Sequence, residues 1–170
     1  MKQPAQVQGF TLLEALVTIV IVSIGLLGLL GLQTVSIVNT QVSASRTQAT
    51  FAADNIADRM RANRAGVDSN AYDGLNHQSA NGSKPNCENG NSCSPAQMAR
   101  YDAFVWDEAL GSSQAGLPQG QGAIACIETA VTGSGCVRYR VTISWQERQP
   151  DQTSGTGTPT TQSFETVVQP

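Results

Sequence analysis

Residues 9–32 of this 170-residue chain read GFTLLEALVTIVIVSIGLLGLLGL, and this stretch decides the fold. Sixteen of the 23 residues from Phe10 to Leu32 are apolar, whereas the whole chain is 40% hydrophobic. A helix of this length spans about 34 Å, which is enough to cross the core of a bilayer. A secretory signal peptide has a shorter apolar region of about 7 to 15 residues, so a membrane-spanning helix is the better interpretation. The small residues at 42–45 leave a cleaved signal peptide as the alternative.

The apolar stretch contains one charged residue and three evenly spaced glycines. Glu14 lies near its start. A carboxylate costs roughly 2.5 to 3.5 kcal/mol at the centre of a bilayer and less near the headgroups. Glu14 therefore either reaches the headgroups or meets a specific partner. Gly25, Gly28 and Gly31 either permit close helix packing, mark a stretch that unwinds, or reflect how common glycine is in membrane helices.

Charge predicts the orientation of the chain. Lys2 and the amino terminus are the only positive charges before the apolar stretch, and no charged residue follows it until Arg46. The positive-inside rule therefore predicts a cytoplasmic N-terminus and an exported C-terminal body. The net charge is −3 and only 14% of residues are charged, so no strongly basic surface indicates a nucleic-acid partner.

A second apolar pattern continues the helix. No glycine or proline occurs between Gly31 and Gly66, so we predict one continuous helix to about Ala65. Apolar residues along it recur at helical spacing and predict a stripe that faces a globular head: Val35, Val38, Val42, Ala49, Ala52, Ile56 and Met60. The β-branched residues of 34–43 leave a strand as the alternative in that part.

The remaining residues predict one more helix and a small sheet. Ser94 followed by Pro95 is typical of a helix start, and Gly111 of a helix end. Apolar alternation and turn residues predict strands at 124–131, 136–147 and 163–168. The predicted fold class is therefore α+β, with the long N-terminal helix packed on a small antiparallel sheet of three or four strands.

Two further assignments concern polar segments of the head. The composition of 67–93 is rich in Asn, Gly and Ser and predicts a long surface loop. Asp102, Asp107 and Glu108 are assigned to the polar side of the second helix rather than to a catalytic group. With one histidine, no G-x-S-x-G and no phosphate-binding loop, the sequence offers no enzyme motif. We expect no catalytic residue and no cofactor.

The cysteines form an even set of four, Cys87, Cys93, Cys126 and Cys136, which supports export to an oxidising compartment. Four cysteines allow three connectivities. We favour the local pairs Cys87–Cys93 and Cys126–Cys136 over crossed pairs. A zinc site is the alternative, but the chain has no C-x-x-C and a single histidine, so we expect no metal.

The motif at 9–15, Gly9-Phe10-Thr11-Leu12-Leu13-Glu14-Ala15, resembles the prepilin cleavage and N-methylation motif of type IV pilins and type II secretion pseudopilins. The resemblance implies that a prepilin peptidase cleaves between Gly9 and Phe10 and methylates Phe10. It also implies that Glu14 pairs with the terminal amine of a neighbouring subunit during assembly. Such a pair is physically reasonable because a cation makes a buried carboxylate tolerable.

The same resemblance implies a type IV pilin-like fold and a division of the chain into four parts. These are a leader peptide at 1–9, a transmembrane or filament-core helix at 10–32, an amphipathic continuation of the helix at 33–65, and a globular pilin head at 66–170. Before assembly, the resemblance places the chain in the inner membrane as a single-pass protein with its head in the periplasm. After assembly, the chain lies in the extracellular pilus.

Short segments at 24–29, 57–63 and 93–97 resemble the PilV-like minor pilins more narrowly. This resemblance implies a role in the complex that initiates and caps the pilus, supporting twitching motility and surface attachment. The implied partners are prepilin peptidase, other minor pilins, the major pilin and the pilus assembly platform. A type II secretion minor pseudopilin and a pilus-borne adhesin or DNA receptor remain as alternatives.

Overall fold

The computed structural model describes residues 11–80, 82–88, 90–112, 117–131, 135–148 and 159–170. Its contacts divide the chain into two units, Met1–Gln41 and Val42–Pro170, and each is described by itself. Helix α1 (Leu12–Ala62) contributes residues to both. We call Leu12–Leu32 the apolar segment and Val42–Pro170 the head unit. The stretch 34–43 is helical, so the alternative of a strand there is wrong.

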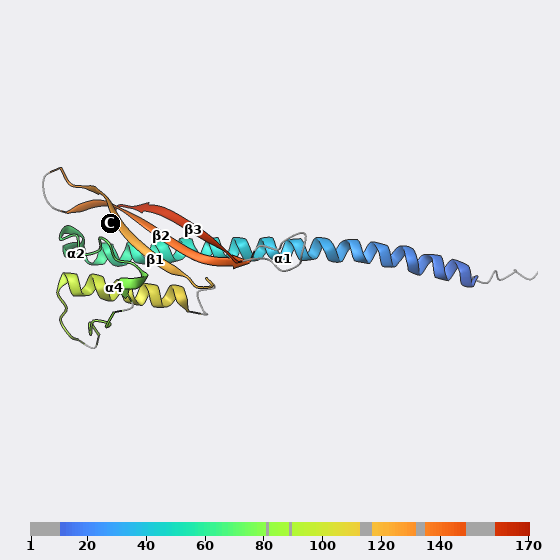
Figure 1. Ribbon diagram of the computed structural model, residues 1–170, viewed down its shortest axis with the longest axis horizontal. Helices are drawn as coiled ribbons and strands as arrows, with labels where there is room; N and C mark the ends of the chain where they lie inside the picture. The colour runs from blue at the N-terminus through green and yellow to red at the C-terminus, as the bar shows by residue number, and fades with distance from the viewer. Residues whose placement is uncertain (1–10, 81, 89, 113–116, 132–134, 149–158) are drawn as a thin grey trace, which may run out of the picture. The chain divides into compact units, whose positions relative to one another are not determined.

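In the head unit, the end of α1 and a second long helix lie side by side and pack with one sheet around a shared core (Figure 1). Its sheet is antiparallel with the order β1-β2-β3. Besides the end of α1, its elements are α2 (Arg64–Asp68), α3 (His77–Ala80), α4 (Pro95–Gly111), β1 (Gln121–Thr129), β2 (Cys136–Arg148) and β3 (Pro159–Val168). The predicted α+β class, with a small antiparallel sheet packed on the long helix, is confirmed. β1 begins three residues earlier than predicted, and β3 four residues earlier.

The core lies between the sheet, α4 and the last turns of α1. From the predicted stripe, Ala49, Ile56 and Met60 are fully buried. The predicted alternation in β2 is confirmed, because its inward residues are buried: Tyr139, Val141, Ile143 and Trp145. Trp106 of α4 joins the same core, and its indole Nε1 donates to the Ala52 carbonyl of α1 at 2.8 Å. This bond fixes α4 beside the helix.

Helix α4 begins and ends where the sequence predicts. The Ser94 hydroxyl accepts from the Gln97 N–H, and the Gln97 side chain accepts from the Ser94 N–H, which completes a capping box. Pro95 occupies the first helical position, where its missing N–H costs nothing. The helix ends at Gly111.

The prediction of one helix to Ala65 is wrong, because α1 ends at Ala62 and α2 begins at Arg64. Asn63 between them has a non-helical backbone. Its amide Nδ2 donates to the Pro95 carbonyl at 2.9 Å and to the Tyr72 hydroxyl at 3.1 Å. Contacts with distant segments therefore stabilise the break.

The prediction of a surface loop over 67–93 is also wrong in its first half. Tyr72 is fully buried, and α3 follows it. Asn76 forms an isolated bridge with Ala123, so this segment lies along β1. The segment folds against the sheet because its main chain supplies hydrogen bonds to β1.

Candidate assembly helix and head surface

The apolar segment of α1 exposes its side chains. All residues from Leu12 to Leu32 are exposed, and Leu12 is 92% exposed. By length and composition alone, α1 is long and apolar enough to cross a membrane. A surface this apolar is typical of a contact with lipid or with another protein.

Hydroxyl groups in the apolar segment have partners within their own helix. Thr18 Oγ1 donates to the Ala15 carbonyl at 2.8 Å, and Ser23 Oγ donates to the Ile19 carbonyl at 2.7 Å. Backbone groups within the helix are paired in the same way. The segment can therefore enter an apolar surrounding without leaving these polar groups unsatisfied.

Glu14 lies in the first turn of α1, with its side chain exposed. Its N–H donates to the Thr11 carbonyl at 3.1 Å and lies 3.3 Å from Thr11 Oγ1. Thr11 therefore caps the helix, a role that our sequence reasoning missed although the T-x-x-E spacing signals it. The carboxylate thus lies at the N-terminal end of α1, where the helix dipole is positive.

The predicted processing residues Gly9 and Phe10 lie outside the described residues. The three glycines lie inside α1, which stays helical through them. An added Cβ at Gly25, Gly28 or Gly31 would meet no other atom within 4 Å. Their backbone is therefore accessible to a closely packed neighbouring helix.

In the head unit, the assignment of Asp102 to the polar side of α4 is wrong. Asp102 is only 5% exposed. It accepts a 2.6 Å hydrogen bond from the Tyr72 hydroxyl, and Arg59 Nη1 lies 3.3 Å from its other oxygen. Burial, followed by the bond to Asp102, raises the pKa of Tyr72 above its usual range. These groups join α1, α4 and the segment before α3, which is a structural role.

Asp107 is also buried, so its assignment to a polar face is likewise wrong. Its Oδ2 lies 2.7 Å from His77 Nδ1, and its Oδ1 accepts from the Gly122 N–H at 3.4 Å. Asp107 thus connects α4 to α3 and to β1. Gly122 is required there, because an added Cβ would lie 2.2 Å from the Trp106 ring.

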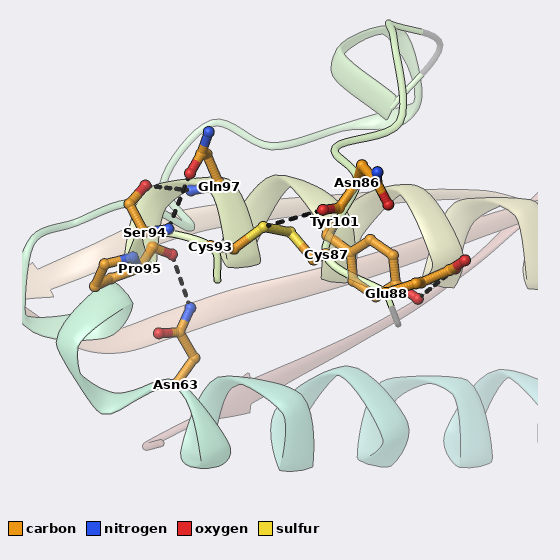
Figure 2. Close-up of a disulfide and its surroundings, with 9 residues drawn as sticks. All are labelled: Asn63, Asn86, Cys87, Glu88, Cys93, Ser94, Pro95, Gln97 and Tyr101. Carbon is orange, nitrogen blue, oxygen red and sulfur yellow. Dashed lines mark hydrogen bonds between the residues drawn. A yellow bond between two sulfur atoms is a disulfide. The ribbon is translucent and has the colours of Figure 1, made fainter. Parts of the chain in front are cut away.

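The loop before α4 is closed by a disulfide between Cys87 and Cys93 (Figure 2). Glu88 within it accepts from the Tyr101 hydroxyl at 2.8 Å and from Lys84 Nζ at 2.7 Å. The bond from Lys84, followed by the bond from Tyr101, lowers the pKa of Glu88. The disulfide therefore closes the loop on itself, and the bond between Glu88 and Tyr101 holds the loop against α4.

The second disulfide joins Cys126 of β1 to Cys136 of β2, with the two Cα atoms 5.9 Å apart. The structure thus has both local pairings and no free cysteine. Among the residues described, no group of three or more His, Cys, Asp or Glu side chains could hold a metal.

Two protein families match the chain. The family described as Type IV pilin Tt1218 matches residues 31–104, and the Prokaryotic N-terminal methylation motif matches residues 5–30. The two matches support a type IV pilin. The long helix packed on an antiparallel sheet is consistent with the type IV pilin fold. No curated protein and no solved structure matches the chain.

Type IV pilins are structural proteins rather than enzymes. The methylation motif implies processing by prepilin peptidase and assembly into a pilus with other pilins. The apolar segment fits both membrane anchoring and incorporation into a pilus. All three strands lie beyond residue 104, so the pilin matches leave the sheet uncovered.

Proposed function

We propose that the protein is a PilV-like minor pilin that acts in type IV pilus assembly, within the complex that initiates the filament and caps its tip. It supports twitching motility and surface attachment, and it has no enzymatic activity. Its partners are prepilin peptidase, other minor pilins, the major pilin and the assembly platform.

In this proposal, prepilin peptidase cleaves between Gly9 and Phe10 and methylates Phe10. The segment 10–32 holds the subunit in the inner membrane and later lies in the filament core, and 33–65 continues the helix. The head, 66–170, lies in the periplasm until the subunit enters the extracellular pilus.

One observation carries the proposal: the exposed apolar segment has a single carboxylate in its first turn. The surrounding side chains of a filament would replace lipid around this segment at little cost. Glu14 would be costly there alone, but the methylated amine of a neighbouring subunit would supply the opposite charge. The pair would then fix the axial position of the incoming subunit.

Mass spectrometry of the mature N-terminus tests the proposal. The expected product from cells with prepilin peptidase begins at a methylated Phe10, whereas the product from cells that lack the peptidase retains Met1. An intact Met1 in both strains, or a start near Arg46, would contradict the proposal.

A deletion strain tests the assigned role against its alternatives. Loss of surface pili with normal protein secretion is expected for a minor pilin of the pilus. Loss of secretion with normal pili would indicate a pseudopilin instead. Normal pili with lost attachment or DNA uptake would indicate an adhesin or receptor.

A further inference from the structure

The sheet has two edge strands, β1 and β3 (Figure 1). They differ in whether their outward main-chain groups have hydrogen-bond partners. In an antiparallel pair, successive residues alternate between those that bond to the neighbouring strand and those that direct N–H and C=O away from it. On an edge strand, the second set faces outward. An outward set without partners is a template for another strand.

On β1, Ile124 belongs to the outward set. Its N–H donates to the Leu75 carbonyl at 2.8 Å, and its carbonyl accepts from the Gly74 N–H at 3.1 Å. The main chain before α3 therefore already occupies both of its outward groups.

The outward residues on either side of Ile124 are Gly122 and Cys126, and both donate to buried or nearby carboxylates. The Gly122 N–H donates to Asp107 at 3.4 Å, and the Cys126 N–H donates to Asp73 at 2.8 Å. The register of β1 also shifts after Cys126, which interrupts the ladder. The β1 edge is thus closed to a further strand.

The same alternation identifies the outward residues of β3. Ile124 lies opposite Val141 of β2, so Val141 directs its main-chain groups toward β3, where it lies opposite Thr166. Thr166 and every second residue from it therefore bond to β2. The outward set consists of the residues between them: Thr161, Ser163, Glu165 and Val167.

Within the described parts of the chain, no group bonds to these four outward main-chain positions. β3 pairs with β2 without a register shift from Pro159 to Val168. Glu165 is its only charged residue, and the strand has no lysine and no internal proline. Apart from Glu165 and the proline that begins the strand, the described residues therefore give this edge none of the usual protections, such as a lysine, an internal proline, a bulge or a covering segment.

The core side of β3 indicates what an added strand would contact. Phe164 lies opposite Ile143 and is only partly buried against the core. An adjacent strand would cover its exposed side with an apolar side chain. The solvent face of β3 carries Thr161, Ser163 and Glu165, with the half-exposed Val167 at its end, and would favour polar residues along most of its length. The edge fits an extended segment in which apolar and polar residues alternate.

We propose that β3 binds such a strand from the head of a different pilus subunit and that the strand extends the sheet through main-chain hydrogen bonds. The identity of the partner as a pilus subunit rests on the function proposed above. The docking edge itself rests on the hydrogen-bond pattern of the sheet.

A proline substitution tests the edge without touching the ladder. Ser163→Pro removes an outward N–H and no bond to β2, so the full-length protein should keep its fold. Ser163→Ala is the matched control, because it changes the side chain and keeps the N–H. We expect Ser163→Pro to lower co-purification with the other minor pilins from detergent-solubilised membranes at least tenfold, and Ser163→Ala to leave it unchanged. Equal loss in both variants, or no loss in Ser163→Pro, would overturn the proposal.

Amide hydrogen exchange gives a second test that requires no variant. In the purified full-length protein, the outward amides of Ser163 and Glu165 should exchange quickly, while those of Phe164 and Thr166 should be protected by β2. In the complex with minor pilins, the outward amides should become at least tenfold slower. Unchanged exchange there would overturn the proposal, as would protection that appears when the protein is concentrated alone, since that would identify a second copy as the occupant.

The two proposals fail separately. A methylated Phe10 start together with unchanged exchange at β3 would reject the docking edge and leave the pilin function standing. Slower exchange at β3 in a complex, together with an N-terminus that is never cleaved, would reject the pilin function and leave the docking edge standing.

Discussion

The apolar segment and the buried end of α1 belong to one helix, but their exposure is the reverse of what their hydropathy suggests. The more apolar part is exposed, and the less apolar part is buried. The apolar segment is rich in leucine and isoleucine and is exposed along its whole length. The end that packs in the head unit buries mostly small residues: Ala49, Ala53, Ile56, Ala57 and Met60. Small residues let the sheet and α4 approach the helix closely. The large exposed residues of the apolar segment have no packing partner within the described part of the chain. Burial in the head unit thus follows residue size, whereas the exposed apolar segment is a surface available to lipid or to another protein.

The largest effect is expected from Glu14→Ala, which removes the one charge of the apolar segment. Leaving the partner amine unpaired in a filament core would cost about 3 to 5 kcal/mol, and at about 1.4 kcal/mol per factor of ten this is more than a hundredfold loss of incorporation. Quantitative immunoblots of sheared pili measure it. Ser23→Ala is the control, since its hydroxyl bonds only within the helix. Normal incorporation of Glu14→Ala would contradict the pairing.

Two isoleucines of α1 test the comparison directly. Ile56 is 0% exposed and Ile24 is 66% exposed. Ile56→Ala should lower the free energy of unfolding of the head unit by about 2 to 5 kcal/mol through lost contacts and a cavity. Ile24→Ala should change it by less than about 0.5 kcal/mol. Urea denaturation of the full-length protein in detergent measures both, and similar values would refute the distinction.

One glycine from each region, Gly122 of the head unit and Gly28 of the apolar segment, tests the same contrast between packed and exposed positions. Gly122→Ala places a methyl group against the Trp106 ring and should destabilise the head unit by about 1 to 3 kcal/mol. Gly28→Ala meets no atom in the subunit and should favour the helix by up to about 1 kcal/mol. Thermal denaturation followed by circular dichroism separates the two. If Gly28→Ala also reduces pilus incorporation, the glycine serves close packing between subunits.

The smallest effect is expected in the pH dependence of the stability of the head unit. Burial raises the pKa of Tyr139 to about 12, whereas the unfolded phenol titrates near 10. The fold favours the protonated phenol, so the contribution of Tyr139 to stability should be constant below about pH 10 and decline as the pH rises toward 12. Tyr139→Phe should make the overall decline in stability shallower, without removing it, because the pKa of Tyr72 is also raised. An unchanged slope in urea titrations at several pH values would contradict this cause.

Local sequence signals predicted the parts of the fold that depend on local chemistry. Ser94 and Pro95 predicted the start of α4 because a cap and a first-turn proline act within one turn. The alternation in β2 predicted its buried face because side chains alternate along any strand. For the candidate site, a short motif placed Glu14 in the first turn of the apolar helix.

Long-range polar contacts account for what the sequence could not predict. The break at Asn63 depends on bonds to Tyr72 and to Pro95, which lies 32 residues further along the chain. Asp102 is buried because the Tyr72 hydroxyl, 30 residues away in sequence, bonds to its carboxylate. Spacing along a single helix cannot reveal such partners, and the charge of Asp102 alone led to its assignment to the polar side of α4.

The self-contained hydrogen bonds of Thr18 and Ser23 have a consequence for how the subunit partitions between bilayer and filament. Because these bonds lie within the helix, they need no exchange when lipid tails give way to protein side chains. The equilibrium between bilayer and filament then depends on helix packing and on the neutralisation of the Glu14 carboxylate. In the proposed assembly, a neighbouring subunit supplies both. If the subunit passes between membrane and filament as proposed above, these hydrogen bonds stay intact in both directions.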